Sequence, residues 1–165
     1  MSSKILSTAS LNALVETADR SPRRRQSLTL HLTSDETCQR LVNAIGIDSY
    51  VRPHRHLLDP KLETLIAIRG RFVLVTFTDE GEVEEVIHFH TEKHEAHHDS
   101  GIGVEIPSGT WLTIIATEPE SIMLEIKAGP FRVELSKEPA LWAPAEETTE
   151  GQEYLGELKK RIGLG

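Results

Sequence analysis

The pattern of apolar and polar positions predicts a short helix followed by a long run of strands. Residues 9–19 carry apolar side chains at helical spacing, where Ser10 can cap the helix and Ser21-Pro22 ends it. From Ser27 the pattern changes to the alternation of polar and apolar residues that is typical of a strand. The chain is therefore expected to continue as β-structure.

Further strands are expected wherever short apolar or β-branched segments lie between turn residues. These segments are residues 39–47, 62–69, 72–77, 83–90, 102–106, 110–117 and 121–127. The first of them could be a helix by propensity, but we prefer a strand. Asp79-Glu80-Gly81 is a hairpin turn signal. Many short strands separated by turns are typical of an antiparallel sandwich or barrel, so the predicted fold class is all-β.

The last part of the chain loses this alternation. Gln152 to Ile162 is expected to form a terminal helix, with Leu155, Leu158 and Ile162 in one stripe that packs on the barrel or on a second subunit. We expect a single domain over residues 1–165, with a core at about 27–135 and a C-terminal extension at 136–165.

Composition narrows the functional classes. The 165 residues carry a net charge of −8, which argues against nucleic-acid binding, and no apolar run is long enough for a membrane span. Cys38 is the single cysteine, which is compatible with a reducing, cytoplasmic location. The basic cluster Arg23-Arg24-Arg25 is expected to be solvated or paired with an acidic neighbour, and the alternative is an anion-binding role.

Three residues form a candidate metal site. His54 and His56 are two positions apart, and in a strand such residues point to the same face. Glu63 follows after a turn and can reach the same point. Two histidines and one carboxylate form a facial ligand set with open positions, which suits Fe, Mn, Ni or Zn.

The same region resembles the cupin superfamily. Its first motif reads Gly, five residues, His-x-His, three or four residues, Glu, six residues, Gly. Glu63 and Gly70 have the required spacing, but Asp48 stands at the leading Gly position and six residues separate His56 from Glu63. The second motif reads Gly, five residues, Pro-x-Gly, two residues, His, three residues, Asn. Pro107 and the residues after it match in part, with Leu112 where the His belongs.

A narrower resemblance is to the WbuC-family cupin fold metalloproteins. It is carried by the stretches SPRRR, QRLVNA, YVRPHRH, IPSGTW and ALWAPAEE, with the region around His31, and it covers about residues 21–148. The resemblance implies a cupin-type double-stranded β-helix, a jelly-roll barrel, with a short N-terminal helix and a C-terminal helix. Leu112 shares a strand face with Ile114 and Ala116, so that face is expected to be packed core rather than a fourth ligand.

Other residues are candidates for supporting roles. The presumed pocket has five candidate ligand-binding residues, namely Arg40, Asn43, Arg52, Lys61 and Trp111. Five histidines between positions 87 and 100 are secondary metal candidates, namely His88, His90, His94, His97 and His98. If Ile87 and Phe89 point inward, His88 and His90 point outward.

Three functions follow from this reading. The first is a metal-binding protein of undetermined activity that acts on a small sugar-related or carboxylate molecule. The second is a small-molecule binding or sensing protein with a degenerate metal site. The third is a metal-free sugar isomerase or epimerase-like enzyme, because the WbuC family is associated with polysaccharide gene sets. Sheet edges need covering, so a homodimer is expected.

Overall fold

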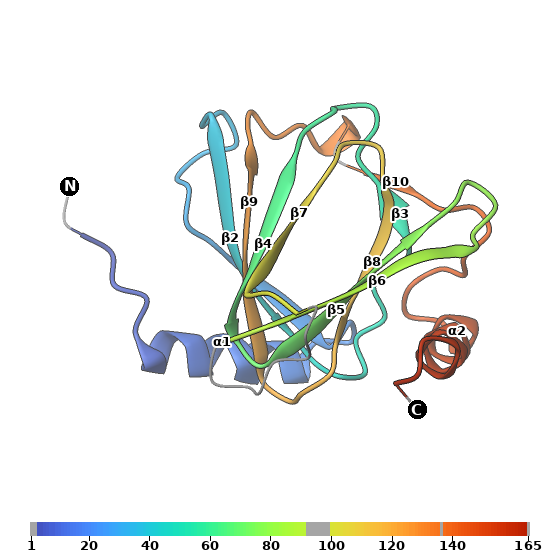
Figure 1. Ribbon diagram of the computed structural model, residues 1–165. Coiled ribbons are helices and arrows are strands. Elements are labelled where there is room, and N and C mark those ends of the chain that lie inside the picture. Colours follow the sequence, from blue (N-terminus) through green and yellow to red (C-terminus); the bar gives the residue numbers. More distant parts are fainter. Residues whose placement is uncertain (1–2, 92–99, 136, 165) are drawn as a thin grey trace.

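The computed structural model describes residues 3–91, 100–135 and 137–164, and the strands form two five-stranded antiparallel sheets that face each other as a barrel (Figure 1). The first sheet has the order β1 (Arg25–Thr29), β2 (Cys38–Ile45), β9 (Ser121–Ala128), β4 (Glu63–Arg69) and β7 (Gly103–Ile106). The second has the order β10 (Glu138–Pro139), β3 (His54–Arg55), β8 (Trp111–Ala116), β5 (Arg71–Phe77) and β6 (Val83–His90). The all-β prediction is confirmed, as is the preference for a strand at residues 39–47.

The strand order places segments side by side that are far apart along the chain. β9 lies between β2 and β4, and β8 lies between β3 and β5. Gly70, which ends β4, has φ +75°, and a Cβ there would lie 2.2 Å from Ser121 Oγ. The turn into β5 therefore requires glycine, because other residues rarely adopt this backbone conformation. This turn passes the chain from one sheet to the other.

The inner faces of the two sheets form the main core. Its buried members are Ile45, Leu65, Ala67, Phe72, Leu74, Phe89, Ile106, Leu112, Ile114, Ala116 and Met123. The predicted packed face of Leu112, Ile114 and Ala116 is therefore confirmed. These side chains alternate along their strands with residues that face outward, as the period of two requires.

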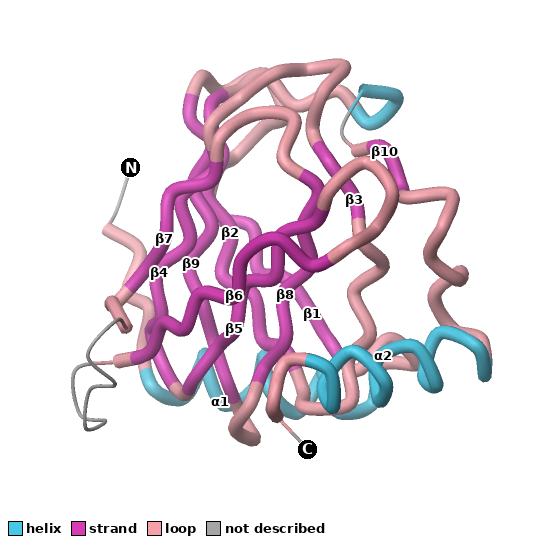
Figure 2. Tube along the Cα trace, turned by 45° about the vertical axis from the view of Figure 1, so that its right-hand side comes forward, coloured by secondary structure: helices cyan, strands magenta, loops and turns pink. Residues whose placement is uncertain are grey.

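Two helices cover the outer faces of the barrel (Figure 2). Helix α1 (Thr8–Arg20) packs Leu11, Leu14, Val15 and Ala18 against the outside of the first sheet. Its cap is Ser7, whose side chain accepts from the Ser10 backbone N–H. The expectation that Ser10 caps the helix is therefore wrong, because the helix begins one turn earlier.

Helix α2 (Thr149–Arg161) packs on the outside of the second sheet, so the predicted terminal helix is confirmed and its stripe lies on the barrel. Leu155 and Leu158 are buried against Tyr50, Val73 and neighbouring apolar residues. The segment before α2, together with the short 3-10 helix η1 (Val133–Leu135), runs over the barrel surface. No helix in the described residues is both long enough and apolar enough to cross a membrane.

The packing of α2 gives a first prediction. Leu155→Ala should lower the free energy of unfolding by about 2–5 kcal/mol, because it deletes buried methyl groups and leaves a cavity. Leu141→Ala is the control: Leu141 is 94% exposed, so its change should be within about 0.5 kcal/mol. Urea unfolding followed by circular dichroism measures both. Equal stability of the two variants would contradict the docking of α2.

Candidate functional site

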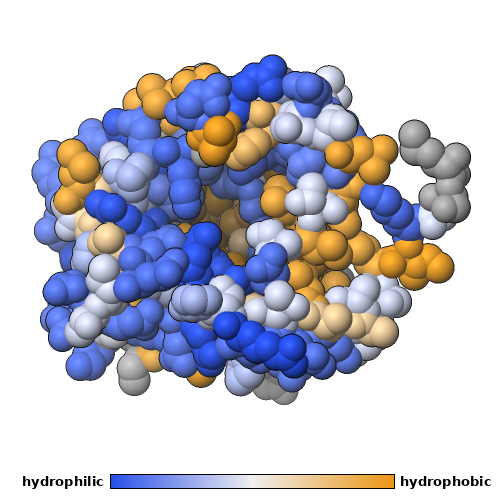
Figure 3. Space-filling model, turned by 180° about the vertical axis from the view of Figure 1, so that it is seen from behind, coloured by the Kyte–Doolittle hydropathy of each residue, from blue (hydrophilic) through white to orange (hydrophobic). Residues whose placement is uncertain are grey.

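A cavity of about 210 Å³ lies between the two sheets. One side of it is lined by residues of β1 and by Lys137, just before β10. Its polar lining residues are Arg23, Arg25, Gln26, Ser27, Asn43, His54, His56, Glu63, Glu125, Lys127 and Lys137. Its apolar lining residues are Ala44, Ile45, Val51, Leu65, Leu112, Ile114 and Met123. Seen from behind, the surface is hollowed, with hydrophobic residues inside the hollow and both hydrophilic and hydrophobic residues around its rim (Figure 3).

His54 and His56 both line this cavity. Their ring centroids are 5.3 Å apart and the rings are nearly perpendicular. His54 Nδ1 lies 2.9 Å from the Arg52 carbonyl oxygen. A carbonyl oxygen only accepts, so Nδ1 carries the proton of the neutral ring and donates it, which leaves Nε2 as an acceptor.

The His54 ring is neutral over most of the pH range. Burial, and then the positive charge of Lys137, lower the pKa of His54 to about 3. His54 lies directly across the sheet from Leu112 of β8, so the ring has an apolar neighbour where the cupin motif has a further ligand. The histidine is therefore a hydrogen-bonding group rather than a charge at neutral pH.

Glu63 belongs to a buried group that also contains a lysine and a second glutamate. Glu63 on β4 is in register with Lys127 on β9, and Glu125 lies two residues before Lys127 on the same strand. Lys127 Nζ is 2.7 Å from Glu125 Oε1 and 3.4 Å from Glu63 Oε1. Asn43 Nδ2 donates to Glu125 Oε2 at 2.8 Å, and Ser27 donates to Asn43 Oδ1. We call these residues the Glu63–Lys127–Glu125 group.

At neutral pH this group holds one proton more than the same three side chains would hold if each were separate in water. Burial, and then the negative charge of Glu125, raise the pKa of Glu63 to about 8. Burial alone would raise the pKa of Glu125, but the charge of Lys127 and hydrogen bonds from Glu63, Lys127 and Asn43 outweigh it and lower the pKa to about 2. At neutral pH one ammonium thus balances one carboxylate charge, and the Glu63–Glu125 pair shares one proton, which burial of Glu63 favours on that side.

The two sides of the cavity offer hydrogen-bond acceptors. Protonated Glu63 donates its O–H to Glu125, which leaves carboxyl oxygens of the pair and His54 Nε2 as acceptors. Their environments push the two pKa values in opposite directions, which is the arrangement that acid–base pairs use. The site can therefore orient a polar molecule and has the groups to donate and accept a proton.

The predicted metal ligands do not fit a divalent metal ion as they lie. His56 Nε2 and Glu63 Oε2 are 3.7 Å apart, but the Lys127 ammonium lies against the same carboxyl group. A cation at this point repels a metal ion, and a protonated carboxyl is a poor ligand. Within residues 3–91, 100–135 and 137–164, no three His, Cys, Asp or Glu side chains are placed to hold a metal.

Two of the five predicted pocket residues lie at or beside the cavity. Asn43 lines it and holds Glu125. Lys61 lines a smaller neighbouring pocket that shares His56 with the cavity. Its ammonium lies 2.6 Å from Asp59 Oδ2, so it is already paired.

The other three pocket residues do not line the cavity. Arg40 pairs with Glu36 on the barrel surface, and the Arg52 guanidinium donates to the Ala140 carbonyl oxygen. Trp111 packs with the apolar residues beneath α2. These three side chains hold surface segments in place.

The histidine-rich stretch follows strand alternation at its start. Ile87 and Phe89 pack with the barrel core, so His88 and His90 are on the opposite face, but His90 is only 7% exposed. The reason is that Gly101 pairs with the end of β6 and covers it, while His90 Nε2 lies 2.9 Å from Ser100 Oγ. His88 is half-buried. The remaining candidates, His94, His97 and His98, lie outside the described residues.

Sequence reasoning missed the charged residues that β9 and the C-terminal extension bring to the cavity and its surroundings. A signal for β9 existed, because Met123, Glu125 and Lys127 alternate on one face of the predicted strand. Two charged residues in line with an inward methionine indicate a polar interior. Lys137 and Glu146 carry no such local signal, since only the fold brings them to the barrel mouth.

Comparison with known structures supports the fold. The chain resembles an uncharacterised conserved protein with a double-stranded β-helix domain from Klebsiella pneumoniae, at 15% identity and a TM-score of 0.55, over 84% of this chain and 98% of that chain. It also resembles protein SO0799 from Shewanella oneidensis, at 9% identity and a TM-score of 0.53, over 68% and 72% of the two chains. The fold is therefore a double-stranded β-helix, as predicted.

The family is identified by its sequence model. Residues 6–89 match the family described as "Domain of unknown function (DUF6016)", and the chain belongs to it. The match spans α1 through nearly all of β6, and so includes both cavity histidines and Glu63. No curated protein matches the chain.

The shared proton gives a prediction about pH. The pKa of Glu63 is higher in the folded chain than its ordinary value of about 4.5. Protonated Glu63 therefore stabilises the folded chain fully below about pH 4.5, and this stabilisation is lost as the pH rises toward 8. Glu63→Gln should therefore lose less unfolding free energy than wild type between about pH 5.5 and 8.5. Glu105→Gln, an exposed glutamate on β7, is the control and should follow wild type. Urea unfolding at both pH values tests this, and parallel losses in all three proteins would contradict the shared proton.

Proposed function

We propose that the barrel cavity binds a small polar organic molecule and that it does so without a metal ion. The observation that carries this is the Lys127 ammonium between Glu63 and Glu125, where the cupin motif would have a carboxylate on a metal. A buried cation already neutralises the carboxylate, so the interior has no charge for a metal to balance.

The residues that line the cavity indicate which kind of ligand it binds. The carboxyl oxygens of Glu63 and Glu125 and the Nε2 of His54 accept, so hydroxyl groups suit the base of the cavity. Leu112 and Met123 supply an apolar wall for a carbon skeleton. The cavity volume of about 210 Å³ is below the ~300–1,000 Å³ of typical drug-sized pockets, which favours a small molecule.

The narrower resemblance, to the WbuC-family proteins, is part of the same proposal. Arg23, Arg25, His54 and His56 come from the SPRRR and YVRPHRH stretches and all line the cavity. This supports kinship with the WbuC-family proteins. We also propose a cytoplasmic homodimer, for which the exposed free thiol of Cys38 and the sheet edges at β6 and β7 are the supporting observations.

A second candidate function is metal binding at His54, His56 and Glu63. The observation that favours it is the hydrogen bond from His54 Nδ1 to a backbone carbonyl, which is how metal-binding histidines are commonly oriented. This function requires Lys127 to leave Glu63, because the ammonium and a metal ion would compete for one carboxyl group.

The proposed function predicts ligand binding by metal-free protein. Untagged protein, freed of metal with a chelating resin, is screened by thermal unfolding against a panel of sugars, polyols and hydroxy acids. At 100 times its Kd a bound molecule should add about 2.7 kcal/mol, or roughly 5–10 °C in Tm. Glu125→Gln should lose the shift, whereas Glu105→Gln should keep it.

Elemental analysis of the same untagged preparations separates the two candidates. We expect far less than one equivalent of transition metal in the wild type. About one equivalent, lost in a His54→Ala/His56→Ala variant, would establish the metal site instead. A panel without any stabilising molecule would overturn the proposed binding function.

A further inference from the structure

The lining of the cavity carries more positive than negative charge. It includes four cationic side chains, namely Arg23, Arg25, Lys127 and Lys137. Glu125 balances Lys127, and a single carboxylate, that of Glu146, serves both arginines. One positive charge remains unbalanced even if Glu63 is counted as ionised, and two remain when it is protonated. An excess of cations in a partly enclosed space favours an anion.

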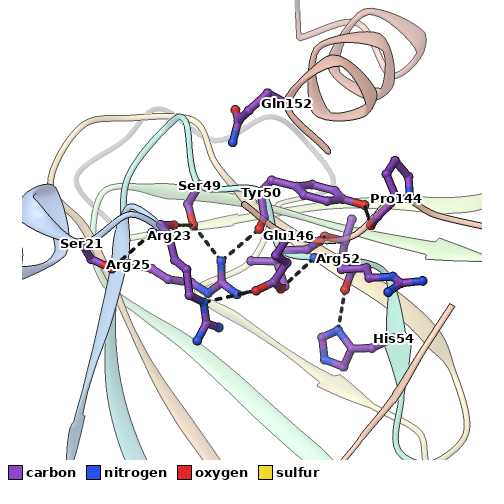
Figure 4. Close-up of polar contacts among 12 residues, drawn as sticks. Ser21, Arg23, Arg25, Ser49, Tyr50, Arg52, His54, Pro144, Glu146 and Gln152 are labelled. Carbon is purple, nitrogen blue, oxygen red and sulfur yellow. Dashed lines mark hydrogen bonds and ion pairs between the residues drawn. The ribbon is translucent and has the colours of Figure 1, made fainter. Parts of the chain in front are cut away.

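The donors of Arg25 are already taken up by contacts within the protein. Arg25 donates to the Tyr50 carbonyl oxygen at 2.9 Å and to Glu146 at 2.6 Å, and its side chain is nearly buried. Glu146 in turn accepts from the Arg52 backbone N–H at 3.1 Å (Figure 4). Arg25 and Glu146 thus anchor the C-terminal extension to the barrel.

Arg23 has donors to spare. Its Nε lies 3.2 Å from Glu146 Oε2, and its side chain is about half exposed. Among the parts of the chain that the structure describes, its two terminal guanidinium nitrogens have no partner. In Figure 4 the Arg23 guanidinium points away from the Arg25–Tyr50 contact. These nitrogens are placed to bind a second anion beside Glu146.

Lys137 is the strongest single indication of an anion-binding site. It lines the cavity, yet its ammonium makes no hydrogen bond or ion pair with any described residue. Burial lowers its pKa, and the charges of Arg25, Arg23 and Lys127 lower it further against the opposing charge of Glu146. The same ammonium lowers the pKa of His54, so it lies near the cavity histidine. A cation held near other cations without a partner is costly, and a structural role in the described chain does not explain it.

We infer that Lys137 and Arg23 form an anion-binding subsite, and that the small molecule in the cavity carries a carboxylate or phosphate group. This inference rests on the proposed small-molecule site and names its ligand class. The anionic group binds at the mouth between Lys137 and Arg23, and the hydroxylated part of the molecule reaches the Glu63–Lys127–Glu125 group. Glu146 positions Arg23 from its other side.

Calorimetric titration with two simple anions tests the subsite. Inorganic phosphate and acetate are each titrated into metal-free wild type at constant ionic strength, which distinguishes the phosphate from the carboxylate source. We expect at least one of them to bind. Lys137→Gln should weaken binding about tenfold or more, because a hydrogen bond to a charged group is lost. Lys160→Gln makes the same charge change on the exposed side of α2 and should bind as wild type does.

The outcomes separate this inference from the proposed function. Binding of neither anion, or equal binding by Lys137→Gln and wild type, overturns the anionic subsite. If the anionic subsite is overturned in this way, a neutral polyol that stabilises wild type but not Glu125→Gln would still support the proposed function. Thermal unfolding without added anion checks that Lys137→Gln is folded, and removal of an unpartnered cation should leave its Tm at or above that of wild type.

Discussion

The ion pair of Lys127 with Glu125 is the interaction on which the interior of this barrel depends. Both side chains are largely enclosed between the sheets, with 17% of Lys127 and 15% of Glu125 exposed, and Glu63 lies against the same ammonium. Without Lys127, Glu125 would be an uncompensated buried carboxylate, which costs several kcal/mol. The ammonium balances the Glu125 carboxylate in the way that a bound metal ion balances a carboxylate ligand. The interior can therefore stay polar and hydrogen-bonded.

The double-stranded β-helix is what assembles this group. β9 runs between β2 and β4, so Asn43, Glu63 and Glu125 converge from three adjacent strands. Each of these side chains points inward because of strand alternation alone. The C-terminal extension then completes the other end of the cavity, where Glu146 connects Arg25 of β1 with the backbone before β3. The base and the mouth of the cavity thus depend on different long-range contacts.

The strands and helices were largely predictable, because their signals are local. Alternation and turn residues located every long strand to within a few positions, and the Leu155 stripe located the terminal helix. The spacing of His54 and His56 placed both in the cavity. The burial of His90 was not predictable, since alternation assigns a residue to a face but does not say whether another segment covers it. Here Gly101 covers the strand end.

The chemistry of the site was likewise predictable only where it depends on local sequence. By itself the sequence determined the fold class, the inward histidines and the apolar face of Leu112, because the period of two depends only on neighbouring residues. It also determined that the usual fourth ligand is replaced by leucine. Only the tertiary structure decided that Glu63 shares its surroundings with Glu125 and Lys127, the latter 64 positions away along the chain. The charge state of a carboxyl depends on burial and on charges within a few ångströms, and the folded chain alone sets those distances.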